Sequence, residues 1–127
     1  MKTHRTSIAE IDFNEEERIL HIKILEGAEM NLKNAQEHYE KINDLLGSKK
    51  YFALVDAKNY YPIEKDAWLY ASSKEVVSNR IAVAQYNSSL GNTITTKFFK
   101  STLNTLMPVE IFDTKEDALK WLKTIPI

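Results

Sequence analysis

The three histidines are the first candidates for catalysis, because imidazole is the commonest general base and a frequent metal ligand at neutral pH. His4 lies near the N-terminus, His21 in a segment of alternating polarity, and His38 in a segment of helical periodicity. No two of them have a spacing that would bring both onto one element as metal ligands. The sequence therefore predicts solvated or half-buried histidines, with His38 on the polar side of its helix, and no metal site.

The sequence also lacks the usual motifs for nucleophilic catalysis and for phosphate binding. The serines at 72, 73, 88 and 89 lie outside any G-x-S-x-G elbow, and Ser88 or Ser89 is better placed to cap a helix. The chain has no cysteine, which excludes thiolate catalysis, thiolate zinc sites and disulfides. With three glycines in all, it has neither a G-x-G-x-x-G nor a Walker loop. We therefore predict no enzyme activity and no cofactor.

Two carboxylates stand out by their positions. Asp56 ends a buried-type strand, at the edge where α/β proteins bind ligands, although its ordinary role there would be to cap the next turn. Asp66 falls in the first turn of the following helix, where the helix dipole favours an acidic residue in any case. An enzyme built on Asp56 and the nearby tyrosines is the third hypothesis, and it requires a deep polar cleft.

Aromatic side chains beside Asp56 are the strongest functional indication. Tyrosine and tryptophan are enriched in interfaces, because they combine a large contact area with a polar group. The alternative is that Trp68 and Tyr70 pack onto the sheet while Tyr60 and Tyr61 cover its end. The predicted partner-binding or ligand-binding surface comprises Asp56, Tyr60, Tyr61, Asp66, Trp68, Tyr70, Asn87 and Ser88.

The elements that must position these residues can be predicted from periodicity. Residues 7–13 and 18–25 alternate in polarity around a polar turn, which is typical of an antiparallel hairpin. Apolar residues at steps of three and four predict a helix over 32–46, with Gly47 as its stop. Nearly continuous apolar runs at 51–55 and 81–86 indicate neighbouring interior strands of a parallel sheet.

The remaining connections are expected to be helical. A helix is predicted from about 64 to 78, with a break near Ser72 and Ser73. A second helix carries Leu90, Ile94, Phe98 and Leu103 at helical spacing, and Phe98, Phe99 and Trp121 are expected in the core. A strand over 109–112 precedes a final helix with Thr114 as its N-cap.

The resulting order is β-β-α-β-α-β-α-β-α, which predicts a single α/β domain over residues 1–127 with a mixed five-stranded sheet. The length of 127 residues, with 43% hydrophobic and 28% charged residues, suits one globular domain. A net charge of −1 argues against nucleic-acid binding, which requires a basic surface. Without a signal peptide or an apolar run of ~18 residues, we expect a cytoplasmic protein that spans no membrane.

Four segments in order carry a resemblance to a known family. They read LVDA at 54–57, AWLYAS at 67–72, NRIAVA at 79–84 and VEIFDTKEDALKWL at 109–122. Together they resemble the SpoIIAA-like branch of the STAS fold, the domain of bacterial anti-sigma factor antagonists, which is also compared with CRAL-TRIO lipid-binding domains. The resemblance covers the chain from about residue 8 onward, and it implies a STAS-like fold and a regulatory role.

The same resemblance allows a test of regulation. In regulatory STAS proteins a D-S-S-G motif begins a helix, and a partner kinase phosphorylates a serine there. Here the corresponding residues are Glu64, Lys65, Asp66 and Ala67, which offer no hydroxyl group. A phosphorylation switch at this position is therefore not expected.

We accordingly expect a non-catalytic module that binds a protein partner or a second copy of itself, as in a homodimer. The alternative is a module that binds a small apolar or lipid-like ligand between its helices and its sheet.

Overall fold

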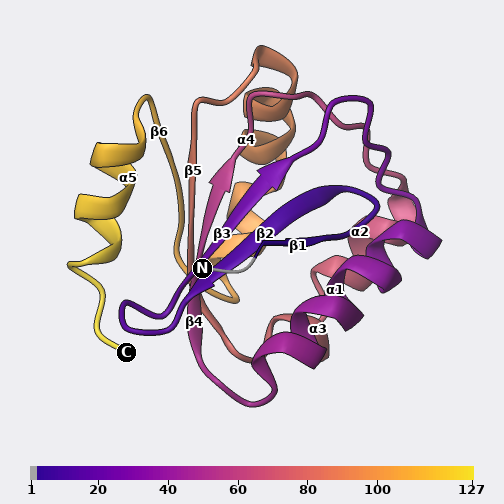
Figure 1. Ribbon diagram of the computed structural model, residues 1–127. Coiled ribbons are helices and arrows are strands. Elements are labelled where there is room, and N and C mark those ends of the chain that lie inside the picture. The colour runs from indigo at the N-terminus through magenta and orange to yellow at the C-terminus, as the bar shows by residue number, and fades with distance from the viewer. Residues whose placement is uncertain (1–2) are drawn as a thin grey trace.

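The computed structural model describes residues 3–127, apart from the side chain of Leu103, as a sheet flanked by helices (Figure 1). The α/β class and the mixed sheet agree with the sequence analysis. The strands are β1 (His4–Arg5), β2 (Ala9–Asn14), β3 (Ile19–Ile24), β4 (Tyr51–Asp56), β5 (Arg80–Tyr86) and β6 (Val109–Phe112). The helices are α1 (Leu32–Leu46), α2 (Lys65–Ala71), α3 (Lys74–Val77), α4 (Leu90–Asn104) and α5 (Lys115–Leu122).

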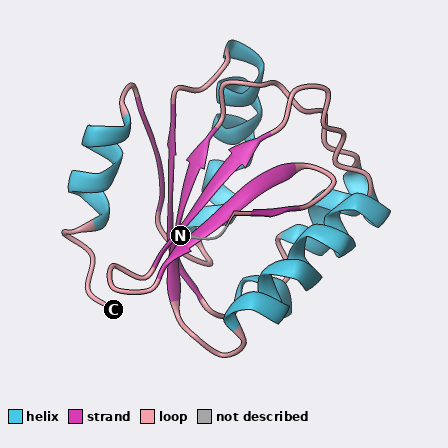
Figure 2. Ribbon diagram, in the orientation of Figure 1, coloured by secondary structure: helices cyan, strands magenta, loops and turns pink. Residues whose placement is uncertain are grey.

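The strands lie in the sheet in the order in which they occur in the chain. β1, β2 and β3 pair antiparallel, whereas β3, β4, β5 and β6 pair parallel. Each right-handed crossover therefore steps in the same direction, which places α1 to α4 on one face and leaves α5 on the other (Figure 2). The predicted interior strands are confirmed, because β4 and β5 are neighbours with a further strand beyond each.

The structure differs from the prediction by one strand and one helix. The sheet has six strands instead of five, because His4 and Arg5 pair with Ile11 and Glu10 and extend the antiparallel edge. The helix expected over 64–78 is divided into α2 and α3 at the predicted break. Both serines at the break satisfy carbonyl groups at the end of α2: the Ser72 hydroxyl donates to Trp68 O and the Ser73 hydroxyl to Tyr70 O, each at 2.7 Å.

The buried strand β4 separates two layers of core. Its side chains alternate between the faces, with Ala53 under the helices α1 and α2 and Leu54 under α5. Both residues are almost fully buried, at 0% and 1% exposure. A strand covered on both faces explains why residues 51–55 read as a continuous apolar run instead of an alternating one.

The ends of the helices follow local sequence. Asn31 caps α1 by accepting a hydrogen bond from Asn34 N at 2.8 Å, and α1 ends at Gly47, whose φ of +58° disfavours other residues. Ser89 Oγ accepts from Asn92 N in the first turn of α4, at 3.2 Å. Thr114 Oγ1 accepts from Asp117 N at 3.2 Å and caps α5 as predicted.

Helix α4 contradicts the expected packing. Phe98 was expected in the core, yet it is 78% exposed, and Leu90 and Ile94, which share its helical spacing, are 77% and 61% exposed. Thr95, Thr96 and Phe99 face the sheet instead. The reason is the buried Gln85 on β5, whose Oε1 accepts a hydrogen bond from Thr96 Oγ1 at 2.9 Å, since a buried amide requires polar partners. Trp121, also expected in the core, is half-buried against Phe112.

Among the helices in residues 3–127, none has the length and apolar character that crossing a bilayer requires.

Candidate functional site

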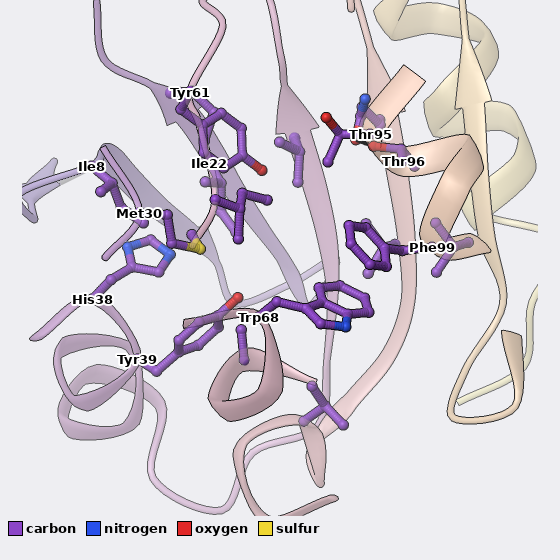
Figure 3. A pocket seen from close by; sticks show the side chains of 18 of the residues that line it. Ile8, Ile22, Met30, His38, Tyr39, Tyr61, Trp68, Thr95, Thr96 and Phe99 are labelled. Carbon is purple, nitrogen blue, oxygen red and sulfur yellow. Dashed lines mark hydrogen bonds between the residues drawn. The ribbon is translucent and has the colours of Figure 1, made fainter. Parts of the chain in front are cut away.

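A cavity of about 120 Å³ lies between the sheet and the helices that cover its larger layer (Figure 3). An apolar protein cavity of ~150 Å³ can hold a benzene molecule, so this space suits a small ring or a short chain. Its apolar walls come mainly from Ile8, Ile22, Ile24, Met30, Val55, Ile63, Trp68, Val77, Val83, Phe99, Met107 and Val109. Its polar lining consists of His38, Tyr39, Tyr61, Arg80, Gln85, Thr95 and Thr96.

An irregularity in the sheet brings Arg80 to the cavity. Tyr51 on β4 pairs with Arg80, but the next residue, Phe52, pairs with Ala82, so Ile81 is an extra residue on β5. With strict alternation Arg80 would share the face of Ala82, beneath α5. The bulge reverses the alternation and places Arg80 on the cavity face, which is a recognised way in which bulges re-aim side chains near functional sites.

The guanidinium group of Arg80 is held by tyrosines instead of a carboxylate. Its Nε donates a hydrogen bond to the Tyr51 hydroxyl at 3.3 Å. Its centre lies 5.4 Å from the ring centroid of Tyr39 and 5.6 Å from that of Tyr51, which is within the range of cation–π attraction. Nη2 is buried and donates to no group in the described chain, and Arg80 takes part in neither of the salt bridges found there.

The protonation states of the cavity follow from this burial. Burial by itself lowers the pKa of Arg80, but the neighbouring Tyr51 and Tyr39 raise it, and the net effect is a pKa above the ordinary value. Arg80 therefore stays charged. Burial raises the pKa of Tyr61, and Tyr39 acts in the same direction. The Tyr61 hydroxyl consequently stays protonated, and it points into the cavity together with that of Tyr39 (Figure 3).

His38 was expected on the polar side of α1, and this prediction is wrong. It lies one turn from Ala35 and from Ile42 on the buried face of the helix, with 3% exposure. Its Nδ1 lies 2.8 Å from the Thr6 hydroxyl. Burial, and secondarily the charge of Arg80, lowers the pKa of His38 to about 3, so the imidazole is neutral at pH 7.

Two of the predicted site residues line the cavity. Tyr61 reaches it from the loop after β4, and Trp68 reaches it from α2. The indole ring of Trp68 stacks on Phe99 with 4.0 Å between ring centroids, which joins α2 to α4. Tyr70, on the same helix as Trp68, is half-buried. Its ring centroid lies 6.2 Å from that of Tyr39.

The other predicted residues lie outside the cavity. Asp56 Oδ1 accepts from Lys58 N at 3.2 Å, which is the turn-capping role weighed in the sequence analysis. Tyr60 is 53% exposed and lies over Gly91, so the structure separates it from Tyr61. Asp66 is exposed and accepts from the next backbone N–H.

The loop after β5 holds the last two predicted residues. Asn87 is exposed and has a φ of +54°, a conformation that asparagine tolerates better than most residues. Ser88 Oγ accepts from Gln85 Nε2 and from Thr93 Oγ1, each at 2.8 Å. Both residues belong to the turn that leads from β5 into α4, away from the cavity lining.

Sequence reasoning missed the polar residues that define the cavity, above all His38, Tyr39 and Arg80. One signal was available for Arg80, which opens a buried-type strand without an acidic residue beside it in sequence. Within residues 3–127, no cluster of three or more histidines and carboxylates is arranged to hold a metal ion.

Comparison with known sequences gives a family. The family model described as a domain of unknown function, DUF7793, matches residues 13–126, and the chain therefore belongs to this family. The matched range includes every residue that lines the cavity except Ile8. No curated protein matches the chain.

Proposed function

We propose that this member of the DUF7793 family is a non-catalytic binding module that holds a small, largely apolar ligand between its helices and its sheet. The observation that carries the proposal is the cavity of about 120 Å³, with apolar walls and a few converging polar groups. Ligand sites in proteins commonly have this composition. The volume is too small for a lipid chain of ordinary length, so the ligand is a compact molecule.

The chemistry of the lining favours binding over catalysis. The lining residues within 3–127 include no carboxylate and no serine, and their one imidazole, on His38, has a pKa lowered to about 3 by burial. A general base works best with a pKa near the working pH, so His38 is a poor candidate. The carboxylate that the enzyme hypothesis requires, on Asp56, lies outside the cavity.

We also propose a STAS-like relationship and a cytoplasmic location. The four segments that carry the resemblance fall at the end of β4, in α2, along β5 and over β6 with α5. Residues 64–67, which would correspond to the regulatory motif, lie at the start of α2 without a hydroxyl group. A cysteine-free chain suits the reducing cytoplasm.

The test is binding of small aromatic probes to the purified chain. Toluene and benzyl alcohol should raise the melting temperature in a concentration-dependent way, because a ligand that binds only the native state stabilises it. The Ala71→Leu variant, which fills part of the cavity, should lose this response. The Leu69→Ala variant alters the exposed side of the same helix and should keep it. If no small aromatic probe, neutral or anionic, stabilises the native chain, the proposal is wrong.

A second function, self-association, is favoured by the outer surface of α4. Leu90, Ile94 and Phe98 recur every fourth residue and form an exposed apolar stripe along the helix. A two-fold axis beside α4 would set the stripe against its copy and bury both at once. We therefore propose a homodimer as the second candidate, in place of the tyrosine surface expected from the sequence.

The dimer can be tested by analytical ultracentrifugation. Phe98→Ser should shift the chain from dimer to monomer, with little change in the melting temperature measured at protein concentrations where the native chain is also monomeric, because Phe98 is exposed in the single chain. Ile127→Ser replaces another exposed apolar residue, which lies outside the stripe, and should leave the dimer intact. A native chain that sediments as a monomer at all accessible concentrations would exclude this candidate.

A further inference from the structure

A cation whose Nη2 atom is buried, and which has no acidic partner among residues 3–127, is the most unusual feature of the cavity. Lone charges are strongly disfavoured in protein interiors, and buried arginines are normally paired with carboxylates. Among residues 3–127, Arg80 makes a hydrogen bond to Tyr51 and cation–π contacts with Tyr39 and Tyr51, and its buried Nη2 has no acceptor. The bulge at Ile81 is what turns this side chain toward the cavity instead of toward α5.

From this geometry we infer that the ligand of the cavity is a small organic monoanion, a carboxylate attached to an apolar ring or short chain. Its carboxylate oxygens would accept hydrogen bonds from Arg80, and its apolar part would lie against Trp68 and Phe99. The inference rests on the proposed ligand-binding function and specifies the class of ligand.

The donors in the cavity suit a carboxylate. Guanidinium groups bind carboxylates through directional, charge-assisted hydrogen bonds, and Nη2 is free to make one. The contacts with Tyr51 and Tyr39 fix the orientation of the group before the ligand arrives. The hydroxyl of Tyr61 also points into the cavity and can serve as a further donor (Figure 3).

The count of charges in the lining selects a monoanion. Among the described residues that line the cavity, Arg80 is the only lysine or arginine, and His38 is neutral at pH 7. A dianion such as a phosphate monoester would leave one negative charge uncompensated in an apolar space, which is costly. The volume of about 120 Å³ further restricts the ligand to the size of a single ring with its carboxylate.

The test compares benzoate with two neutral probes of similar shape, benzamide and toluene, by isothermal titration calorimetry. We expect benzoate to bind the native chain at least about tenfold more tightly than benzamide, as charge-assisted hydrogen bonds to arginine allow. Arg80→Met should remove this preference while toluene still binds. Tyr51→Phe, which deletes the hydroxyl that accepts from Nε, should weaken benzoate more than toluene.

The outcomes separate this inference from the proposed function. If toluene or benzamide binds the native chain as tightly as benzoate, the anion specificity is wrong and the ligand-binding function stands. If Arg80→Met keeps the preference for benzoate, Arg80 does not recognise the anion and the inference fails. If none of the three probes binds, both the inference and the function are overturned.

Circular dichroism establishes that each variant is folded. If Arg80→Met does not fold, it is replaced by Arg80→Lys, which keeps the charge without the planar fork.

Discussion

At the scale of single residues, the chain holds the half-buried Arg80 with aromatic rings and one hydroxyl group. Arg80 has Tyr39 and Tyr51 on its flanks, and the cation–π contacts and the bond to Tyr51 partly replace the hydration that it loses. Such contacts compensate a buried charge less fully than a carboxylate does. The residue therefore favours binding of an anion at some expense to the stability of the free protein.

The two adjacent loop tyrosines should differ in their effect on stability. Tyr61 lines the cavity and packs against the larger core, so Tyr61→Ala should lower the free energy of unfolding by about 2 kcal/mol or more. Tyr60 is mostly exposed, so Tyr60→Ala should change it by about 0.5 kcal/mol or less. Urea unfolding followed by circular dichroism measures both. Equal losses would mean that the loop is packed differently from the structure.

His38 should give the stability of the protein a pH dependence. Its pKa is about 3 in the folded chain and close to 6.5 in the unfolded chain, so the unfolded state binds the proton more readily between these values. Stability from this group is therefore complete above pH 6.5 and falls as the pH drops toward 3. The loss should be at most about 1.4 kcal/mol per pH unit.

Urea unfolding of the native chain at pH 7 and at pH 5 measures this dependence. His38→Gln should flatten it, since the substituted amide does not titrate. His21→Gln is the matched control, because burial also lowers the pKa of His21 but that ring is only half-buried, and it should flatten the dependence less. If His38→Gln retains the full loss between pH 7 and pH 5, His38 is not the group responsible.

At the scale of elements, periodicity predicted most strands and helices, but it did not predict which way each one faces. The helix at 32–46 was recovered because its apolar positions repeat with the period of a helix packed on one side. Helix α4 was oriented incorrectly because its apolar stripe is exposed, while Thr96 on its inner face donates a hydrogen bond to the buried Gln85 of the preceding strand, which periodicity alone does not reveal. The face on which Arg80 lies could not be predicted from alternation, because the bulge at Ile81 arises from pairing with β4.

Helix α4 carries apolar side chains on its exposed face and polar ones on its inner face. We therefore expect that losing a threonine hydroxyl here destabilises the fold more than losing a phenylalanine ring. Thr96→Val places a more apolar side chain on the inner face, yet it leaves Gln85 Oε1 without its donor and should cost about 1–2 kcal/mol. Phe98→Ser removes a large apolar side chain from an exposed position and should cost less in a monomeric sample. Thermal unfolding at low protein concentration compares the two, and a larger loss for Phe98→Ser would show that Phe98 is buried within the chain.

At the scale of the whole molecule, the sequential strand order gives the two faces of the sheet different coverings. In residues 3–127, α1 to α4 cover one face of the sheet (Figure 1). The cavity lies in this layer and is lined by residues of α1, α2 and α4. A single helix, α5, covers the other face with a compact cluster around Leu54, Ala84 and Leu122. The cavity is thus confined to one layer, and the other layer is a closely packed apolar cluster.

This division predicts that changes on opposite faces act independently. Leu122 is 1% exposed in the cluster beneath α5, so Leu122→Ala should cost about 3 kcal/mol of unfolding free energy. Tyr61→Ala acts in the other layer, and the two residues share no cluster, so their effects should add within about 0.5 kcal/mol. Leu122→Ala should also leave the affinity for aromatic probes unchanged under conditions where it is folded, because the sheet separates it from the cavity. A double-mutant cycle by urea unfolding measures the first expectation and calorimetry the second. A coupling energy well above 0.5 kcal/mol would show that the layers communicate through β4, whose side chains contribute to both.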